Sequence, residues 1–188
     1  GRIYKVVYGD VKNPGSIDLA KQTSLELAAY QLHKNDWYVR HARRLLQERY
    51  VAGDDIGDAR KELMRMLDSG DYEADRELRF IWALNSSGGV GEKRLTSLLD
   101  HRNEHVRSWA VRLIGEGGLP TKSQFNKIRK LASNGESRLV RMYVASTFPR
   151  FSENQQWTLA EDLLSDFGYA SDQNLPYMIW YALLPLVE

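Results

Sequence analysis

Residues 101–105 have the composition and spacing of a zinc-binding motif. The segment His101-Arg-Asn-Glu-His105 holds two imidazoles and a carboxylate within five residues. On a single helix, two histidines at this spacing can bind zinc while the glutamate activates a zinc-bound water. Here the five residues lie across a predicted turn, so that His101 ends one helix and Glu104 begins the next. Because no third ligand is evident either, we expect no metal and no other cofactor.

Arginines form a second pattern, because four of them follow an aliphatic residue just after a short polar turn. The four dipeptides, separated by 39, 28 and 34 residues, are Val39-Arg40, Leu78-Arg79, Val106-Arg107 and Val140-Arg141. Guanidinium groups placed once per repeat can bind carboxylates or helix-end carbonyls of a neighbouring repeat. They can also form a row of cations along a groove. We favour the first interpretation, because residues fixed by a repeat usually serve the repeat.

Basic residues are concentrated in the middle of the chain. Residues 91–150 carry 12 basic and 5 acidic side chains, whereas residues 151–188 carry 6 acidic side chains and neither lysine nor arginine. The net charge of +1 therefore conceals a basic zone and an acidic end. Such asymmetry can attract acidic protein or phosphates, or help the acidic end to dock elsewhere. Our candidate partner-binding residues are Arg40, Arg79, Arg107, Arg112, Lys127, Lys130 and Arg141.

Paired helices are the elements that must position these side chains. Apolar residues recur at helical spacing from residue 23 onward, and short polar or glycine-containing turns separate the apolar segments. The second and fifth predicted pairs run over 58–67 with 75–84 and 157–164 with 175–186. The first pair starts near residue 23 or 24, and Gly53 ends its second helix. The apolar residues of the third and fourth pairs lie at 95–99 with 106–113 and at 125–131 with 139–144. A period of about 30–45 residues with one helix pair per period predicts a stacked helical solenoid.

We therefore predict an all-α domain over residues 17–188, an α-α superhelix of about five helix pairs. Residues 1–16 are predicted to form a short extended segment, because residues 2–8 are strand-like and residues 12–16 have a turn composition. Leu25 and Leu32 belong to the predicted apolar stripe of the first helix. Aromatic residues at helical spacing are usually core. The tryptophans expected there are Trp37, Trp82, Trp109, Trp157 and Trp180.

The Val-Arg or Leu-Arg dipeptide near the start of four of the five predicted second helices resembles the pattern of HEAT repeats. Residues 1–8, 35–49 and 174–187 also resemble the helical part of the PVC-type (planctomycete–verrucomicrobial) membrane-bound dehydrogenase family. In that family a β-propeller precedes the HEAT segment and a cytochrome c module often follows it. This chain has no cysteine and hence no haem-attachment motif. The resemblance implies a connecting module without redox chemistry, in an exported and therefore extracytoplasmic protein.

We expect a non-catalytic scaffold that binds a protein domain or peptide, including other domains of a longer parent chain. A parent chain is expected because the sequence begins at Gly1 and enters a strand-like stretch at once. No apolar run reaches the roughly 20 residues that a membrane span requires. The alternative is nucleic-acid binding through the basic middle, similar to HEAT-like alkylpurine DNA glycosylases. The nearly neutral total charge, and the lack of an acidic residue matching their catalytic aspartate, argue against it.

Overall fold

The computed structural model describes residues 6, 8–10, 15–133, 136–165, 168 and 170–187. Over these residues the chain forms ten α-helices and three short 3-10 helices, without a strand. The predicted all-α fold is thereby confirmed. Most of the strand-like stretch over residues 2–8 lies outside the described residues, and the two residues of it that are described, Val6 and Tyr8, are fully exposed.

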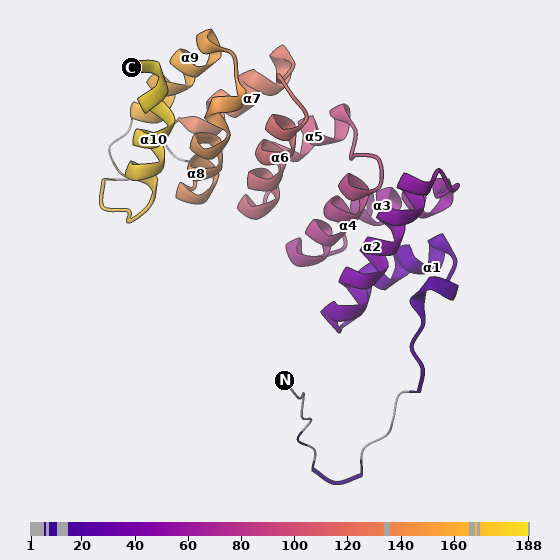
Figure 1. Cartoon of the computed structure of the whole chain (residues 1–188). Helices are drawn as coiled ribbons and strands as arrows, with labels where there is room; N and C mark the ends of the chain where they lie inside the picture. The colour runs from indigo at the N-terminus through magenta and orange to yellow at the C-terminus, as the bar shows by residue number, and fades with distance from the viewer. Residues whose placement is uncertain are drawn as a thin grey trace.

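The ten helices follow one another as five pairs along a row (Figure 1). The first helices of the pairs are α1 (Ser24–Ala29), α3 (Gly57–Ser69), α5 (Glu92–Leu98), α7 (Lys122–Ala132) and α9 (Glu153–Leu164). The second helices are α2 (Asp36–Ala52), α4 (Ala74–Ser86), α6 (Glu104–Glu116), α8 (Arg138–Thr147) and α10 (Leu175–Val187). The 3-10 helices cover Leu19–Lys21, Tyr30–Leu32 and Phe148–Arg150.

Local side-chain chemistry explains where most helices begin and end. The side chains of Asn35 and Asn103 accept hydrogen bonds from backbone amides of the first turns of α2 and α6. Thr121 opens α7 with a reciprocal capping box, in which the side chain of Gln124 returns a bond to the cap amide. Gly53 ends α2 with φ of 84°, a left-handed conformation that glycine adopts without a steric penalty.

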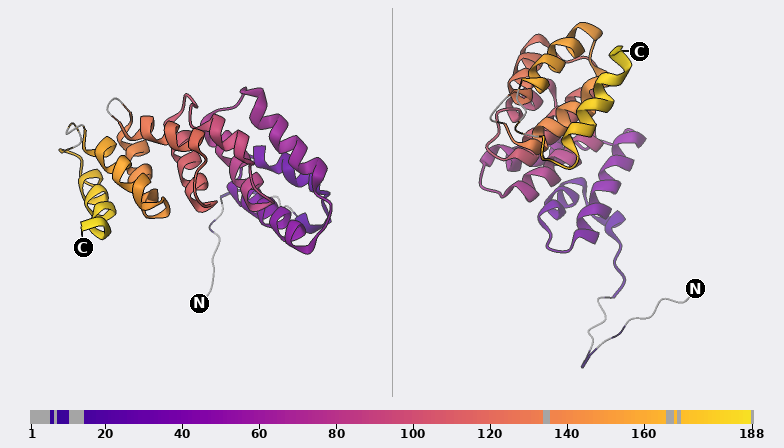
Figure 2. Two further views of the ribbon diagram at one scale, coloured as in Figure 1. Left: turned by 90° about the horizontal axis from the view of Figure 1, so that it is seen from above. Right: turned by 90° about the vertical axis from the view of Figure 1, so that its left-hand side faces the viewer.

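The core is continuous along the row, because each second helix packs against the second helix of the next pair. Contacts join α2 to α4, α4 to α6, α6 to α8 and α8 to α10, and the left view of Figure 2 shows the pairs in this order. Leu46, Ile81, Val106 and Val144 are among the fully buried side chains. Apolar faces that no single pair could cover are therefore buried between neighbours.

Several aromatic and aliphatic residues are more exposed than predicted. Trp37 is 52% exposed, Trp157 45% and Trp180 59%, while Trp82 and Trp109 are only partly buried. The prediction of core tryptophans was therefore wrong for Trp37, Trp157 and Trp180, whereas Trp82 and Trp109 do pack against the core. Exposure of Leu25 and Leu32 at the first helix pair was also unexpected. Among the described residues, the first and last pairs have a neighbouring pair on one side only, which leaves part of their apolar surface uncovered.

Candidate functional site

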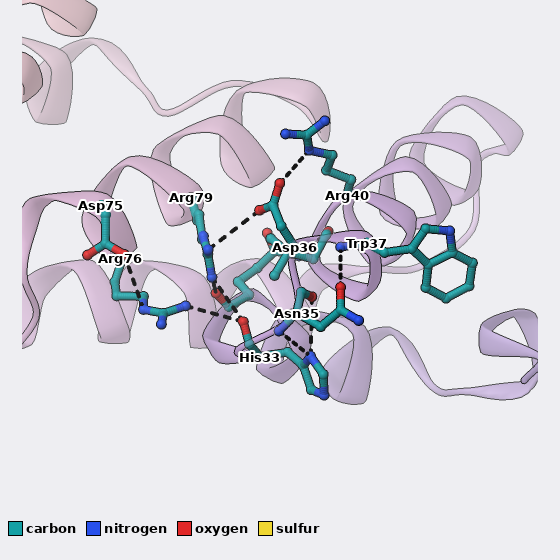
Figure 3. A network of polar contacts seen from close by, with 10 residues as sticks. His33, Asn35, Asp36, Trp37, Arg40, Asp75, Arg76 and Arg79 are labelled. Atoms are coloured by element: carbon teal, nitrogen blue, oxygen red, sulfur yellow. Dashed lines mark hydrogen bonds and ion pairs between the residues drawn. The ribbon is translucent and has the colours of Figure 1, made fainter. Parts of the chain in front are cut away.

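Arg40 and Arg79 meet at one carboxylate between the first two second helices (Figure 3). Arg79 donates to the carbonyl oxygen of His33 at 3.0 Å and to that of Gln31 at 3.4 Å, and its guanidinium lies 3.5 Å from Asp36. Arg40 is exposed and binds the same Asp36 at 2.5 Å within α2. Arg79 thus ties the second helix pair to the first, whereas Arg40 makes its ion pair within its own helix.

The two later arginines of the motif also reach the next helix pair. Arg107 donates to the carbonyl oxygen of His101 at 2.7 Å and to Glu136, in the next helix pair, at 2.5 Å. Arg141 is buried, and its guanidinium donates to the carbonyl oxygen of Leu163 near the end of α9 at 2.7 Å. Three of the four motif arginines therefore hold neighbouring helix pairs together.

Ion pairs join every helix pair to the next. They neutralise several basic side chains of residues 91–150. The pairs are Asp36–Arg79, Asp68–Arg94, Asp100–Lys127, Arg107–Glu136, Arg129–Asp162 and Arg138–Asp172. Two of these carboxylates, Asp162 and Asp172, come from the acidic last 38 residues of the sequence. Two ion pairs, Arg129–Asp162 and Arg138–Asp172, thus join the acidic end to the basic repeats.

Residues 101–105 lie across a turn, as their spacing predicts. His101 follows the end of α5, and Glu104 is the first residue of α6. The Nε2 atom of His101 lies 3.3 Å from the buried carboxylate of Glu77 on α4. In the part of the chain that the structure describes, no three histidine, aspartate or glutamate side chains come together as metal ligands.

A row of stacked arginine and tryptophan side chains crosses three successive second helices, from α2 through α4 to α6. The guanidinium carbon of Arg43 lies 5.4 Å from the centre of the Trp82 ring, and that of Arg112 lies 4.7 Å from the Trp109 ring. Between them, the rings of Trp82 and Trp109 meet edge to face with centres 5.1 Å apart. We call these four residues the Arg–Trp row.

Charge is distributed unequally at the two ends of the Arg–Trp row. Arg112 binds Glu116 at 2.7 Å, and this hydrogen bond raises the pKa of the Arg112 guanidinium. Burial lowers the pKa of Arg43, and the nearby cations Arg40 and Arg79 lower it further against the attraction of Asp36. Arg43 makes no ion pair with any residue that the structure describes. Its charge is therefore partly desolvated and lacks a direct carboxylate partner.

A pocket of about 410 Å³ continues the same surface beyond Arg112, where α6, α8 and α10 meet. Met142 and Met178 supply apolar walls, and Tyr143, Ser146 and Arg150 supply polar groups. Arg150 is exposed and, within the described part of the chain, has no acidic partner. We call the Arg–Trp row and this pocket together the second-helix face.

Not all predicted partner-binding residues belong to the second-helix face. Arg112 lies in its centre, and Arg40 and Arg79 adjoin Arg43 at one end. Lys127 and Lys130 lie on α7, which is a first helix, and Lys127 is paired with Asp100. The sequence analysis missed Arg43 and Arg150, because neither belongs to the Val-Arg motif. A signal for Arg43 was present, because the residues three and four positions away on its helix, Val39, Arg40, Leu46 and Gln47, include no acidic side chain.

No family model, curated protein or solved structure matches the chain. The resemblance to the PVC-type family therefore stays a prediction. Within the described ranges, the structure also has no helix that is both long and apolar enough to cross a bilayer.

Proposed function

We propose that the chain is a non-catalytic helical-repeat module of the HEAT type, whose second-helix face binds a segment of another protein domain or of a peptide. The repeated Val-Arg dipeptides and the stacking of second helices support a HEAT-like superhelix. The family resemblance supports a place within a larger exported protein related to the PVC-type dehydrogenases.

The Arg–Trp row is the observation that carries this proposal. Tryptophan and arginine are enriched where proteins bind proteins, because both combine a large apolar surface with hydrogen-bond donors. In this chain, cation–π contacts already hold both types of side chain in place across three helices. A surface that is ordered before binding loses less side-chain entropy when a partner arrives.

Nucleic-acid binding, the alternative, receives less support. Arg94, Arg107, Lys127 and Arg129, which make up much of the basic zone, are held by carboxylates of neighbouring helix pairs. A phosphate backbone would have to compete with these carboxylates. Nonspecific binding to nucleic acid depends on free cations whose counterions are released. Among the described residues, the exposed cations of the middle helix pairs that make no ion pair are Lys93, Arg102, Lys122 and Lys130, and binding to a phosphate backbone would depend on them.

Selection from a displayed library of random peptides against the purified chain tests this proposal. We expect peptides to be selected, and we expect Arg112→Gln and Trp109→Ala to weaken their binding. Arg65→Gln and Trp157→Ala are the matched controls, because both residues are exposed on first helices, away from the second-helix face. Binding that is lost in the control variants but kept in the face variants would refute the proposal. Thermal melts by circular dichroism establish that each variant is folded.

A further inference from the structure

We infer that the segment bound on the second-helix face is acidic, with carboxylates that pair with Arg43 at one end and Arg150 at the other. The inference rests on the proposed function and names the chemistry of its partner. Large apolar side chains of the same segment would lie on the tryptophan rings and in the pocket between α6, α8 and α10.

An excess of positive charge on this face is the first argument. Near the start of the Arg–Trp row, Arg40 and Arg79 share the single carboxylate of Asp36, and Arg43 makes no ion pair with any described residue. At the other end of the face, Arg112 is neutralised by Glu116, which leaves Arg150 as an uncompensated cation. Unpaired cations at both ends favour a partner that brings negative charge to both ends.

The surroundings of the Arg43 guanidinium are the second argument. Its central carbon lies 5.4 Å from the centre of the Trp82 ring and the residue is partly buried, so the group has already lost part of its hydration. The N–H groups of a guanidinium form a planar fork that matches the two oxygens of a carboxylate. An incoming carboxylate therefore restores the interactions that burial has removed from Arg43.

Occupation of the ring faces argues for a peptide rather than for nucleic acid. Single-stranded nucleic acids bind proteins largely by stacking their bases on open aromatic faces. Here Arg43 lies over the Trp82 ring and Arg112 lies over the Trp109 ring, while the two rings contact each other. Bases would have to displace the arginines, whereas a carboxylate and an aliphatic side chain can bind beside them.

The pocket is the reason to expect apolar side chains in the bound segment. Met142 and Met178 line it together with Arg112 and Arg150, so an apolar side chain can enter beside a carboxylate. Methionine side chains adapt to the shape of what they contact. Neighbouring helices are spaced by about 8–10 Å, so the second helices from α2 to α8 span roughly 24–30 Å. An extended peptide of about 8 residues covers that length.

Fluorescence anisotropy with labelled peptides of about 12 residues tests the inference. One peptide alternates Glu with Leu and Phe, and the second replaces every Glu by Gln. We expect the acidic peptide to bind and the Gln peptide to bind at least about tenfold more weakly. Arg43→Gln and Arg150→Gln should each weaken binding of the acidic peptide by about threefold to tenfold, in the range of one ordinary hydrogen bond. The control Arg65→Gln should leave binding unchanged.

Different results would refute the acidic partner alone or the proposed function as well. Equal binding of the Gln peptide, or unchanged binding by both arginine variants, would overturn the acidic partner. A single-stranded oligonucleotide of matched charge that binds more tightly than the acidic peptide would do the same, in favour of nucleic acid. If the peptide library yields ligands without acidic enrichment, the proposed function stands and the inference fails. If it yields no ligand at all, both fail.

Discussion

The four motif arginines occupy the same position of the repeat but differ in burial and in the groups they bind. Arg141 is buried and binds a helix-end carbonyl of the next pair, while Arg40 is exposed and binds only Asp36 of its own helix. The spacing in the sequence predicts where these side chains lie. Their partners depend on which groups the neighbouring pair presents, and that information is not contained in the motif.

Arg141→Ala and Arg40→Ala should therefore differ in their effect on stability. We expect Arg141→Ala to lower the free energy of unfolding by about 2–3 kcal/mol, because it removes a buried, charged hydrogen-bond donor and leaves the carbonyl of Leu163 without that bond. Arg40→Ala should cost less than about 1 kcal/mol, as is typical of an exposed ion pair. Urea unfolding followed by circular dichroism measures both values. Equal losses would contradict the assigned contacts.

Exposure is the residue-level property that the sequence predicted least well. Val106 and Leu113 are buried as their helical spacing indicates, but Trp37 and Trp180 are not. Hydrophobicity and period identify the apolar side of a helix, yet they do not show whether another helix covers that side. Covering depends on the position of the helix pair in the row, and α10 is packed against α8 and α9 on one side only.

At the scale of elements, the helix limits could be predicted well because their causes are local. Asn35, Asn103 and Gly53 act on the backbone within a few residues of themselves, so the sequence alone places the starts of α2 and α6 and the end of α2. The distance between helices is different, because it depends on side chains far apart in the sequence. The contact between Gly115 and Thr147 is an example.

Gly115 allows α6 and α8 to approach closely. A Cβ atom built at this position would lie 2.0 Å from the Cγ2 atom of Thr147, which is much closer than any real contact. We expect Gly115→Ala to destabilise the chain by about 1–3 kcal/mol through overpacking. Combining it with Thr147→Ser, which removes the clashing methyl group but keeps the hydroxyl, should recover part of the loss. Thermal melts that show no loss in the single variant, or no recovery in the double variant, would refute this contact.

Asp172 makes the start of α10 sensitive to acid. Its carboxylate accepts hydrogen bonds from the backbone amides of Leu175 and Asn174, each at 2.9 Å, and these bonds lower the pKa of Asp172, with a smaller effect from Arg138. A lowered pKa in the folded state adds stability above the unfolded pKa of about 3.9. That stability is lost as the pH falls through the folded pKa.

The variant Asp172→Asn tests this dependence, because it keeps an acceptor oxygen but removes the charge. Wild type should melt at a higher temperature than the variant at neutral pH, and the difference should disappear once the pH is well below about 4. Differential scanning calorimetry across this range measures it. A difference that persists unchanged in acid would show that the charge of Asp172 does not contribute.

At the scale of the whole molecule, the uneven charge along the sequence has a structural role. Carboxylates from both flanks, Asp68 on one side and Asp162 on the other, bind arginines of the middle helix pairs. The sequence showed the asymmetry but could not show which charges would meet. Pairing depends on the register between stacked helices, which no local pattern determines. Arg43 and Arg150 became visible as uncompensated cations only once these pairs were known.

The most direct measurement of the central claim is a titration of the ¹⁵N-labelled chain with a peptide selected from the library, followed by NMR. The five tryptophans supply five indole N–H signals, which single Trp→Phe variants can assign. We predict that the signals of Trp82 and Trp109 shift while that of Trp157, on a first helix, stays in place. A shift of the Trp157 signal, with those of Trp82 and Trp109 unmoved, would place binding on the first helices and contradict the account.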